Sequence, residues 1–60
     1  MIILIIELDP DNDGQLLLRN SDGKISASDF FSLEEVFEYV KNNYISYRLE
    51  VSEKVVNNWR

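Results

Sequence analysis

The opening residues, Met1 to Leu8, limit the fold more than any other part of this chain. Seven of these eight residues are apolar, and the run is rich in isoleucine. A strand with one face in water alternates polar and apolar side chains, whereas a run without alternation needs cover on both faces. One helix can cover only one face of a small sheet. We therefore expect the other face to meet the tail, a second copy or a partner, which favours binding over catalysis.

Length and composition narrow the functional classes further. Sixty residues make one domain, residues 1–60, which buries only about 60% of its unfolded surface. The chain contains no cysteine and no histidine, which excludes disulfides, thiol chemistry and the usual general base. Two glycines are too few for a glycine-rich phosphate loop. A protein that is not an enzyme is expected.

The opening apolar run is not expected to be a membrane or export segment. It is too short to cross a bilayer. It also lacks the basic flank and the small-residue cleavage site of a signal peptide. A cytoplasmic location, without membrane contact, is the expectation.

The net charge of −5 is unevenly distributed. Residues 1–38 carry nine acidic side chains against two basic ones, whereas residues 39–60 carry two against four. Direct nucleic-acid binding is disfavoured because phosphate contacts require clustered Lys and Arg. A basic protein surface is the better electrostatic partner for the acidic part. The alternative is that the acids simply keep a small domain soluble.

Local patterns predict strands near 1–8, 15–19 and 45–51, with a short fourth strand near 24–27 as an option. Pro10 and Gly14 suit the first turn, and residues 20–23 suit the second. The pair Ser32 and Glu35 forms a capping box, and Phe31 is placed to make a hydrophobic staple with Val36. A helix is therefore predicted over 33–43. Its apolar stripe consists of Leu33, Val36, Phe37, Val40 and Tyr44.

The predicted fold is α+β: a small antiparallel sheet of three or four strands, in ββαβ order, with one helix packed on one face. Alternation along the first strand assigns one larger set of side chains to the core: Ile2, Leu4, Ile6 and Leu8. The smaller set, Ile3 and Ile5 with Leu17 as a neighbour, is then the exposed group. The alternative is that Val55, Val56 and Trp59 fold back over it.

One loop resembles part of an EF-hand calcium loop. Residues 9–16 place Asp9, Asp11 and Asp13 at alternate positions, followed by Gly14 and an aliphatic residue. Position twelve of such a loop would be Asn20 and not the usual bidentate glutamate, and the flanks read as strands. Because Asp, Asn and Gly are also what tight turns use, a plain turn is favoured over a calcium site.

The function predicted from the sequence is an acidic protein-binding module, for example a phage-type inhibitor or regulator that occupies a basic, nucleic-acid-binding surface of a host protein. The alternatives are a calcium-binding protein and a structural homodimer.

Tyr39 lies off the apolar stripe and is expected to be exposed, while Trp59 suits either core or interface. Glu34 and Glu38 read as solvated charges and not as a catalytic pair. The predicted partner-binding residues are Ile3, Ile5, Leu17, Glu34, Glu35, Glu38, Tyr39 and Trp59.

Overall fold

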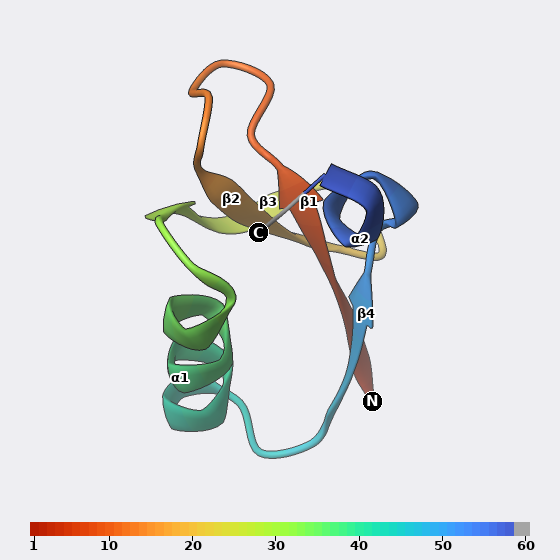
Figure 1. Cartoon of the computed structure of the whole chain (residues 1–60). Helices are drawn as coiled ribbons and strands as arrows, with labels where there is room; N and C mark the ends of the chain where they lie inside the picture. The colour runs from red at the N-terminus through yellow and green to blue at the C-terminus, as the bar shows by residue number, and fades with distance from the viewer. Residues whose placement is uncertain (59–60) are drawn as a thin grey trace.

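The computed structural model describes residues 1–58, which form a four-stranded mixed sheet and two helices (Figure 1). The elements in chain order are β1 (Ile2–Leu8), β2 (Leu16–Asn20), β3 (Ile25–Phe30), α1 (Leu33–Asn43), β4 (Tyr47–Val51) and α2 (Glu53–Asn58). The strand order across the sheet is β3-β2-β1-β4. The predicted α+β class is confirmed, and so is the predicted helix packed on one face of the sheet.

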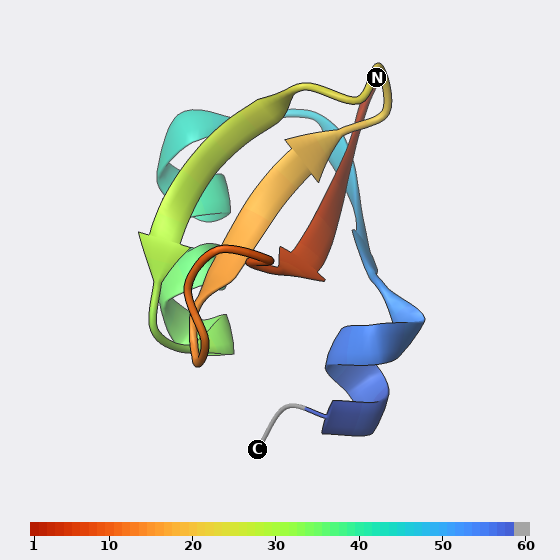
Figure 2. The ribbon, with the colours of Figure 1, turned by 90° about the horizontal axis from the view of Figure 1, so that it is seen from above.

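The direction of β4 differs from the prediction of a wholly antiparallel sheet. The first three strands pair antiparallel, but β4 pairs parallel to β1, with Ile2 opposite Tyr47 and Ile6 opposite Val51. Two reversals make β3 run in the same direction as β1. Helix α1 then carries the chain back, so the next strand again runs with β1 (Figure 2). Alternation in the sequence of β4 predicts a strand but contains no information on its direction.

Strand β3 extends to Phe30, well beyond the predicted 24–27, and its pairing with β2 contains register shifts of the kind that a β-bulge makes. Ala27 lies opposite Leu18 and Phe30 lies opposite Leu16, so the β3 side of this interval is one residue longer. Asp29, within it, has a left-handed backbone (φ 67°), which Asp tolerates better than most residues. The extra residue keeps Ala27 and Phe30 on the same face, and Phe30 is buried.

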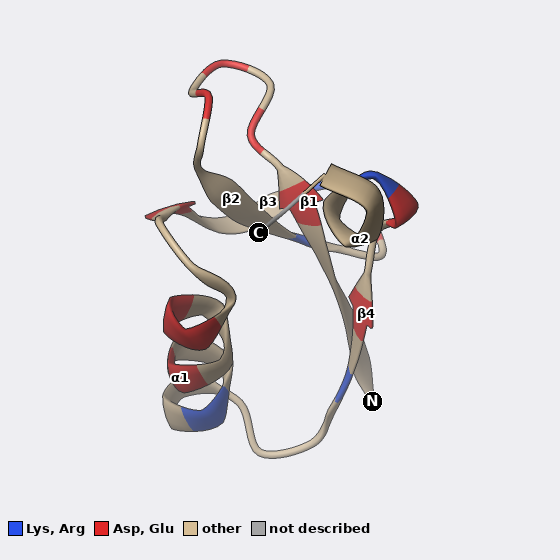
Figure 3. Ribbon diagram, in the orientation of Figure 1, with Lys and Arg blue, Asp and Glu red and all other residues tan. Residues whose placement is uncertain are grey.

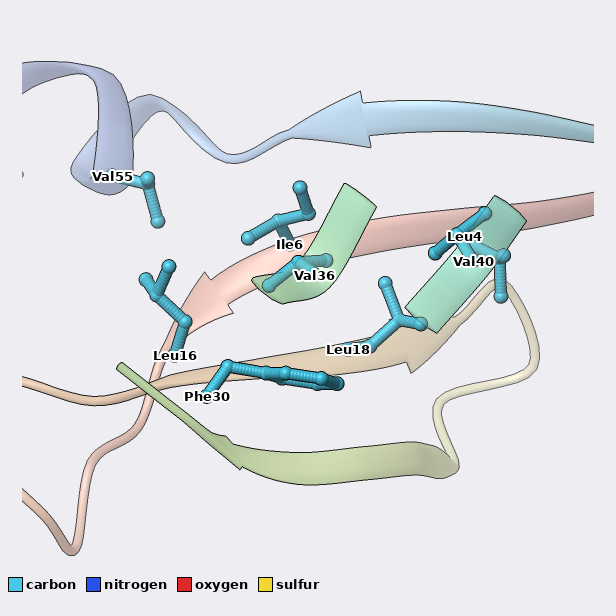
Figure 4. Close-up of a cluster of buried hydrophobic side chains, with 8 residues drawn as sticks. All are labelled: Leu4, Ile6, Leu16, Leu18, Phe30, Val36, Val40 and Val55. Atoms are coloured by element: carbon cyan, nitrogen blue, oxygen red, sulfur yellow. The ribbon is translucent and has the colours of Figure 1, made fainter. Parts of the chain in front are cut away.

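The core lies between the sheet and the two helices (Figure 4). Leu4 and Ile6 are fully buried, as predicted from the alternation of β1. Helix α1 contacts β2 and β3, while Val55 of α2 closes the core beside β1. Val55 lies on the face of Leu4 and Ile6 and Val56 is 67% exposed, so the alternative in which the tail folds back over Ile3 and Ile5 is wrong for these two residues. The buried cluster consists of Leu4, Ile6, Leu16, Leu18, Phe30, Val36, Val40 and Val55.

Helix α1 has the predicted bounds and the predicted N-terminal cap. The Ser32 hydroxyl accepts a hydrogen bond from the Glu35 amide at 3.2 Å. In return, the Glu35 carboxylate accepts one from the Phe31 amide at 3.1 Å. The return bond thus reaches one residue before the cap. The first bond satisfies the Glu35 amide, which a helix start otherwise leaves without a partner, and the second satisfies the amide of the residue before the cap.

The predicted apolar stripe of α1 is wrong at one residue, and the expected exposure of Tyr39 is wrong as well. Phe37 is 47% exposed, whereas Tyr39 is partly buried, with its ring 5.5 Å from that of Phe30 in an edge-to-face arrangement. The helix contacts the central strand β2 and the edge strand β3, so its buried side is turned toward β3. Phe31 is 62% exposed, which does not support the predicted staple with Val36.

Alanine substitutions at a buried core position and at Phe37 should therefore lower the free energy of unfolding by different amounts. Leu18→Ala removes a fully buried side chain and is expected to lower the free energy of unfolding by about 2–5 kcal/mol. Phe37→Ala is expected to cost about 1 kcal/mol or less, because half of that ring is already in water. Urea denaturation measures both. Equal losses would show that Phe37 is buried and that α1 is rotated about its axis relative to this structure.

The cap of α1 should also be measurable. Ser32→Ala is expected to cost about 1 kcal/mol, since the Glu35 amide loses its acceptor. Ser46→Ala, at an exposed position in the loop after α1, is the matched control and should change stability by less than about 0.5 kcal/mol. If the two variants melt alike, the cap does not stabilise the helix.

Candidate functional site

An open groove lies at the end of β1, between the β1–β2 loop and the start of α2. Its volume is about 500 Å³, and its lining residues are Glu7, Leu8, Pro10, Arg19, Ser52, Glu53 and Lys54. Glu7 and Arg19 form an ion pair at 2.8 Å, and Arg19 also donates to the Gly23 carbonyl oxygen at 2.7 Å. This arrangement ties β1, β2 and the β2–β3 turn together. The two charged groups already serve as each other's partners, which favours a structural role over proton transfer.

The β1–β2 loop is built as a turn and not as a calcium loop. The Asp9 carboxylate accepts hydrogen bonds from the Asp11 amide at 2.9 Å and from the Asn12 side chain at 3.3 Å. Gly14 has φ 80°, the left-handed conformation expected at that position. Within residues 1–58, no three acidic side chains lie close enough to hold a metal ion. The structure thus does not bring Asp9, Asp11 and Asp13 together as a ligand set.

The second sheet face is less open than the sequence predicts. Leu17 is only 2% exposed, and Ile3 and Ile5 are partly buried, so the expectation of an exposed group is wrong for Leu17. Glu7 lies opposite Leu17 and Arg19 opposite Ile5, so their ion pair runs diagonally across this face. The β1–β2 loop lies on the same side, away from α1 (Figures 1 and 2). Polar side chains and a loop supply the cover here.

The solvent side of α1 joins acidic and aromatic side chains. Glu34 and Glu38 are four residues apart and so lie on one flank of the helix, with Phe37 next to them. All three are exposed, as is Phe31 just before the helix. We call these four residues, Phe31, Glu34, Phe37 and Glu38, the acidic face of α1. Glu35, also exposed, is engaged in the cap.

Acidic residues occur on both sides of the sheet (Figure 3). Acidic residues occur in the β1–β2 loop, at the end of β3 and in the first turns of α1, with Lys41 in the last turn of α1. The ion pairs found in residues 1–58 are Glu7–Arg19 and Arg48–Glu50, so neither involves a carboxylate of α1. Glu34 and Glu38 therefore have no ion-pair partner among residues 1–58.

The predicted partner-binding residues do not form one surface. Glu34, Glu35 and Glu38 lie together on α1, but Tyr39 packs against Phe30, and Ile3 and Ile5 belong to the sheet. Trp59 lies outside the described residues. Phe31 and Phe37 were not included in the site predicted from the sequence. Phe31 was assigned to a hydrophobic staple with Val36, and Phe37 to the buried stripe of the helix. Their positions beside Glu34, Glu35 and Glu38 were the available signal.

Comparisons with protein-family models, curated proteins and solved structures find no match for this chain. In the described part of the chain, neither helix has both the length and the apolar character needed to cross a membrane.

Calcium provides a direct test of the β1–β2 loop. Adding calcium is expected to leave the Tm and the amide shifts of residues 9–15 unchanged, because the Asp9 carboxylate faces donors within its own loop. Asp9→Ala should lower stability by about 1 kcal/mol, through loss of these two bonds. A saturable calcium shift at residues 9–14 that disappears in Asp9→Ala would reinstate the metal site.

Proposed function

We propose that this protein is a non-enzymatic protein-binding module whose acidic face of α1 binds a basic protein surface. The observation that carries the proposal is the exposure of Phe31 and Phe37, 62% and 47%, beside glutamates that lack ion-pair partners in residues 1–58. Large aromatic side chains supply much of the binding energy in protein interfaces. Charged neighbours steer the encounter and select the partner.

The two kinds of side chain have different physical roles in this proposal. Glu34 and Glu38 attract a basic surface over distances comparable to the Debye length and so increase the association rate. Phe37 is half-exposed and can bury its remaining surface only when a partner arrives, so it acts mainly on the dissociation rate. Lys41 limits the acidic region at the last turn of α1.

A basic surface that normally binds nucleic acid is the partner class that fits best. Such surfaces present clustered Lys and Arg to phosphates, and carboxylates spaced along a helix offer an alternative set of negative charges. Asp29, exposed at the end of β3 just before α1, adds the same sign of charge. An inhibitor or regulator, for example of phage type, that competes with nucleic acid is the specific form of this proposal.

The test is capture from a lysate of the source cell with wild-type and variant protein as bait, followed by kinetics on the captured partner. The double variant Glu34→Lys/Glu38→Lys should lose the partner, with an association rate lower by roughly tenfold or more. Phe37→Ser should keep the association rate and dissociate faster. Added salt should weaken wild-type binding in the same way as the charge reversal.

The matched control is Asp11→Lys/Asp13→Lys, which changes the net charge equally at exposed positions of the β1–β2 loop. It should retain the partner with a nearly unchanged association rate. If the control loses the partner as strongly as the α1 variant does, then net charge and not the acidic face of α1 determines binding. An affinity independent of salt would also contradict the proposal.

A further inference from the structure

Strand β4 lies at one edge of the sheet, and within the described residues its outer edge pairs with no other strand. The Ser52 amide donates to the Ile6 carbonyl oxygen of β1 at 2.9 Å. Backbone groups alternate in direction along a strand, so those of Arg48 and Glu50 also point toward β1. The N–H and C=O groups of Tyr47, Leu49 and Val51 therefore point outward, away from the sheet.

We propose that a second copy of this chain pairs with this edge, β4 against β4 in antiparallel orientation, about a two-fold axis at Leu49. In this register Leu49 lies opposite Leu49 of the second copy, and Tyr47 lies opposite its Val51. All of these residues have outward backbone groups, so each pair can exchange N–H···O=C hydrogen bonds. Edge pairing by strand addition is an established mode of association.

Charge complementarity favours a second copy of this chain as the partner of the β4 edge, and it favours this register. Arg48 and Glu50 flank Leu49, so the two-fold axis places Arg48 of each copy opposite Glu50 of the other. These are the non-hydrogen-bonded pairs, in which facing side chains come closest. Within one chain the two groups already form an exposed pair at 3.2 Å, and the dimer would join both pairs into one network of alternating sign. A like-charged edge would instead repel its own copy.

The apolar side chains of β4 support the same arrangement. Val51 is 39% exposed, and Tyr47 and Leu49 are partly buried at the margin of the core. Helix α1 contacts β2 and β3, at the other half of the sheet, and so does not cover β4 (Figure 1). Pairing would place Leu49 beside its counterpart and Tyr47 beside Val51, which removes apolar surface from water. Two five-residue strands make a small interface, so the dimer should dissociate on dilution.

Sedimentation velocity over a range of concentrations tests the pairing. Charge-reversal variants of Arg48 and Glu50 distinguish it from other modes of self-association. Arg48→Glu puts two carboxylates on each β4 edge, and Glu50→Arg puts two guanidinium groups there. Each single variant should weaken self-association by roughly tenfold to a hundredfold, because like charges then lie opposite each other. An equimolar mixture of the two variants should restore dimers, and the double variant Arg48→Glu/Glu50→Arg should dimerise like the wild type.

Hydrogen exchange provides a second readout that is specific to the edge. The amides of Tyr47, Leu49 and Val51 should become protected as the concentration rises, whereas the Arg48 and Glu50 amides, which face β1, should not change. Circular dichroism verifies that each variant is folded. The Glu34→Lys/Glu38→Lys variant should still dimerise, which separates this proposal from the function proposed for α1. A monomeric wild type, or a dimer that neither single reversal weakens, would overturn it.

Discussion

The fold depends on the burial of β1 within the sheet. This strand pairs with β2 on one side and β4 on the other, so it links the N-terminal hairpin to the C-terminal half of the chain. Its inward side chains, Leu4 and Ile6, contribute to the main core with α1 and α2. Its outward side chains lie beneath a surface crossed by the Glu7–Arg19 ion pair. A strand without polar alternation is stable here because each face has its own kind of cover.

The helices do not cover the sheet evenly. Two surfaces are left exposed as a result, the acidic face of α1 and the outer edge of β4. Helix α1 is placed over β2 and β3, which buries Tyr39 and leaves Phe37 in solvent beside Glu34 and Glu38. Strand β4 lies at an edge of the sheet, and among residues 1–58 no other strand pairs with its outer side. The acidic face of α1 and the β4 edge lie on different parts of the molecule, so the proposed dimer would carry two acidic faces that remain free.

Local sequence signals predicted what short-range interactions control. The Ser32 cap and the predicted bounds of α1 are confirmed, because both depend on hydrogen bonds between near neighbours. The Glu35 carboxylate, however, accepts from the Phe31 amide and not from the Ser32 amide that a capping box uses. The assignment of Leu4 and Ile6 to the core is confirmed, since alternation depends only on the pleat of the strand. The favoured turn interpretation of residues 9–14 agrees with the hydrogen bonds of Asp9. Of the candidate site, the sequence identified Glu34, Glu35 and Glu38 but neither phenylalanine.

Local sequence patterns thus predicted the segments that form β1, β2, β4 and α1, and where α1 begins and ends. Tertiary structure decided the direction of β4, the bulge at Asp29, the burial of Leu17 and the exchange of roles between Phe37 and Tyr39. The physical reason is that each of these depends on which elements lie side by side. A helical stripe defines an apolar side, but the part of the sheet beneath the helix determines which ring at its margin is buried.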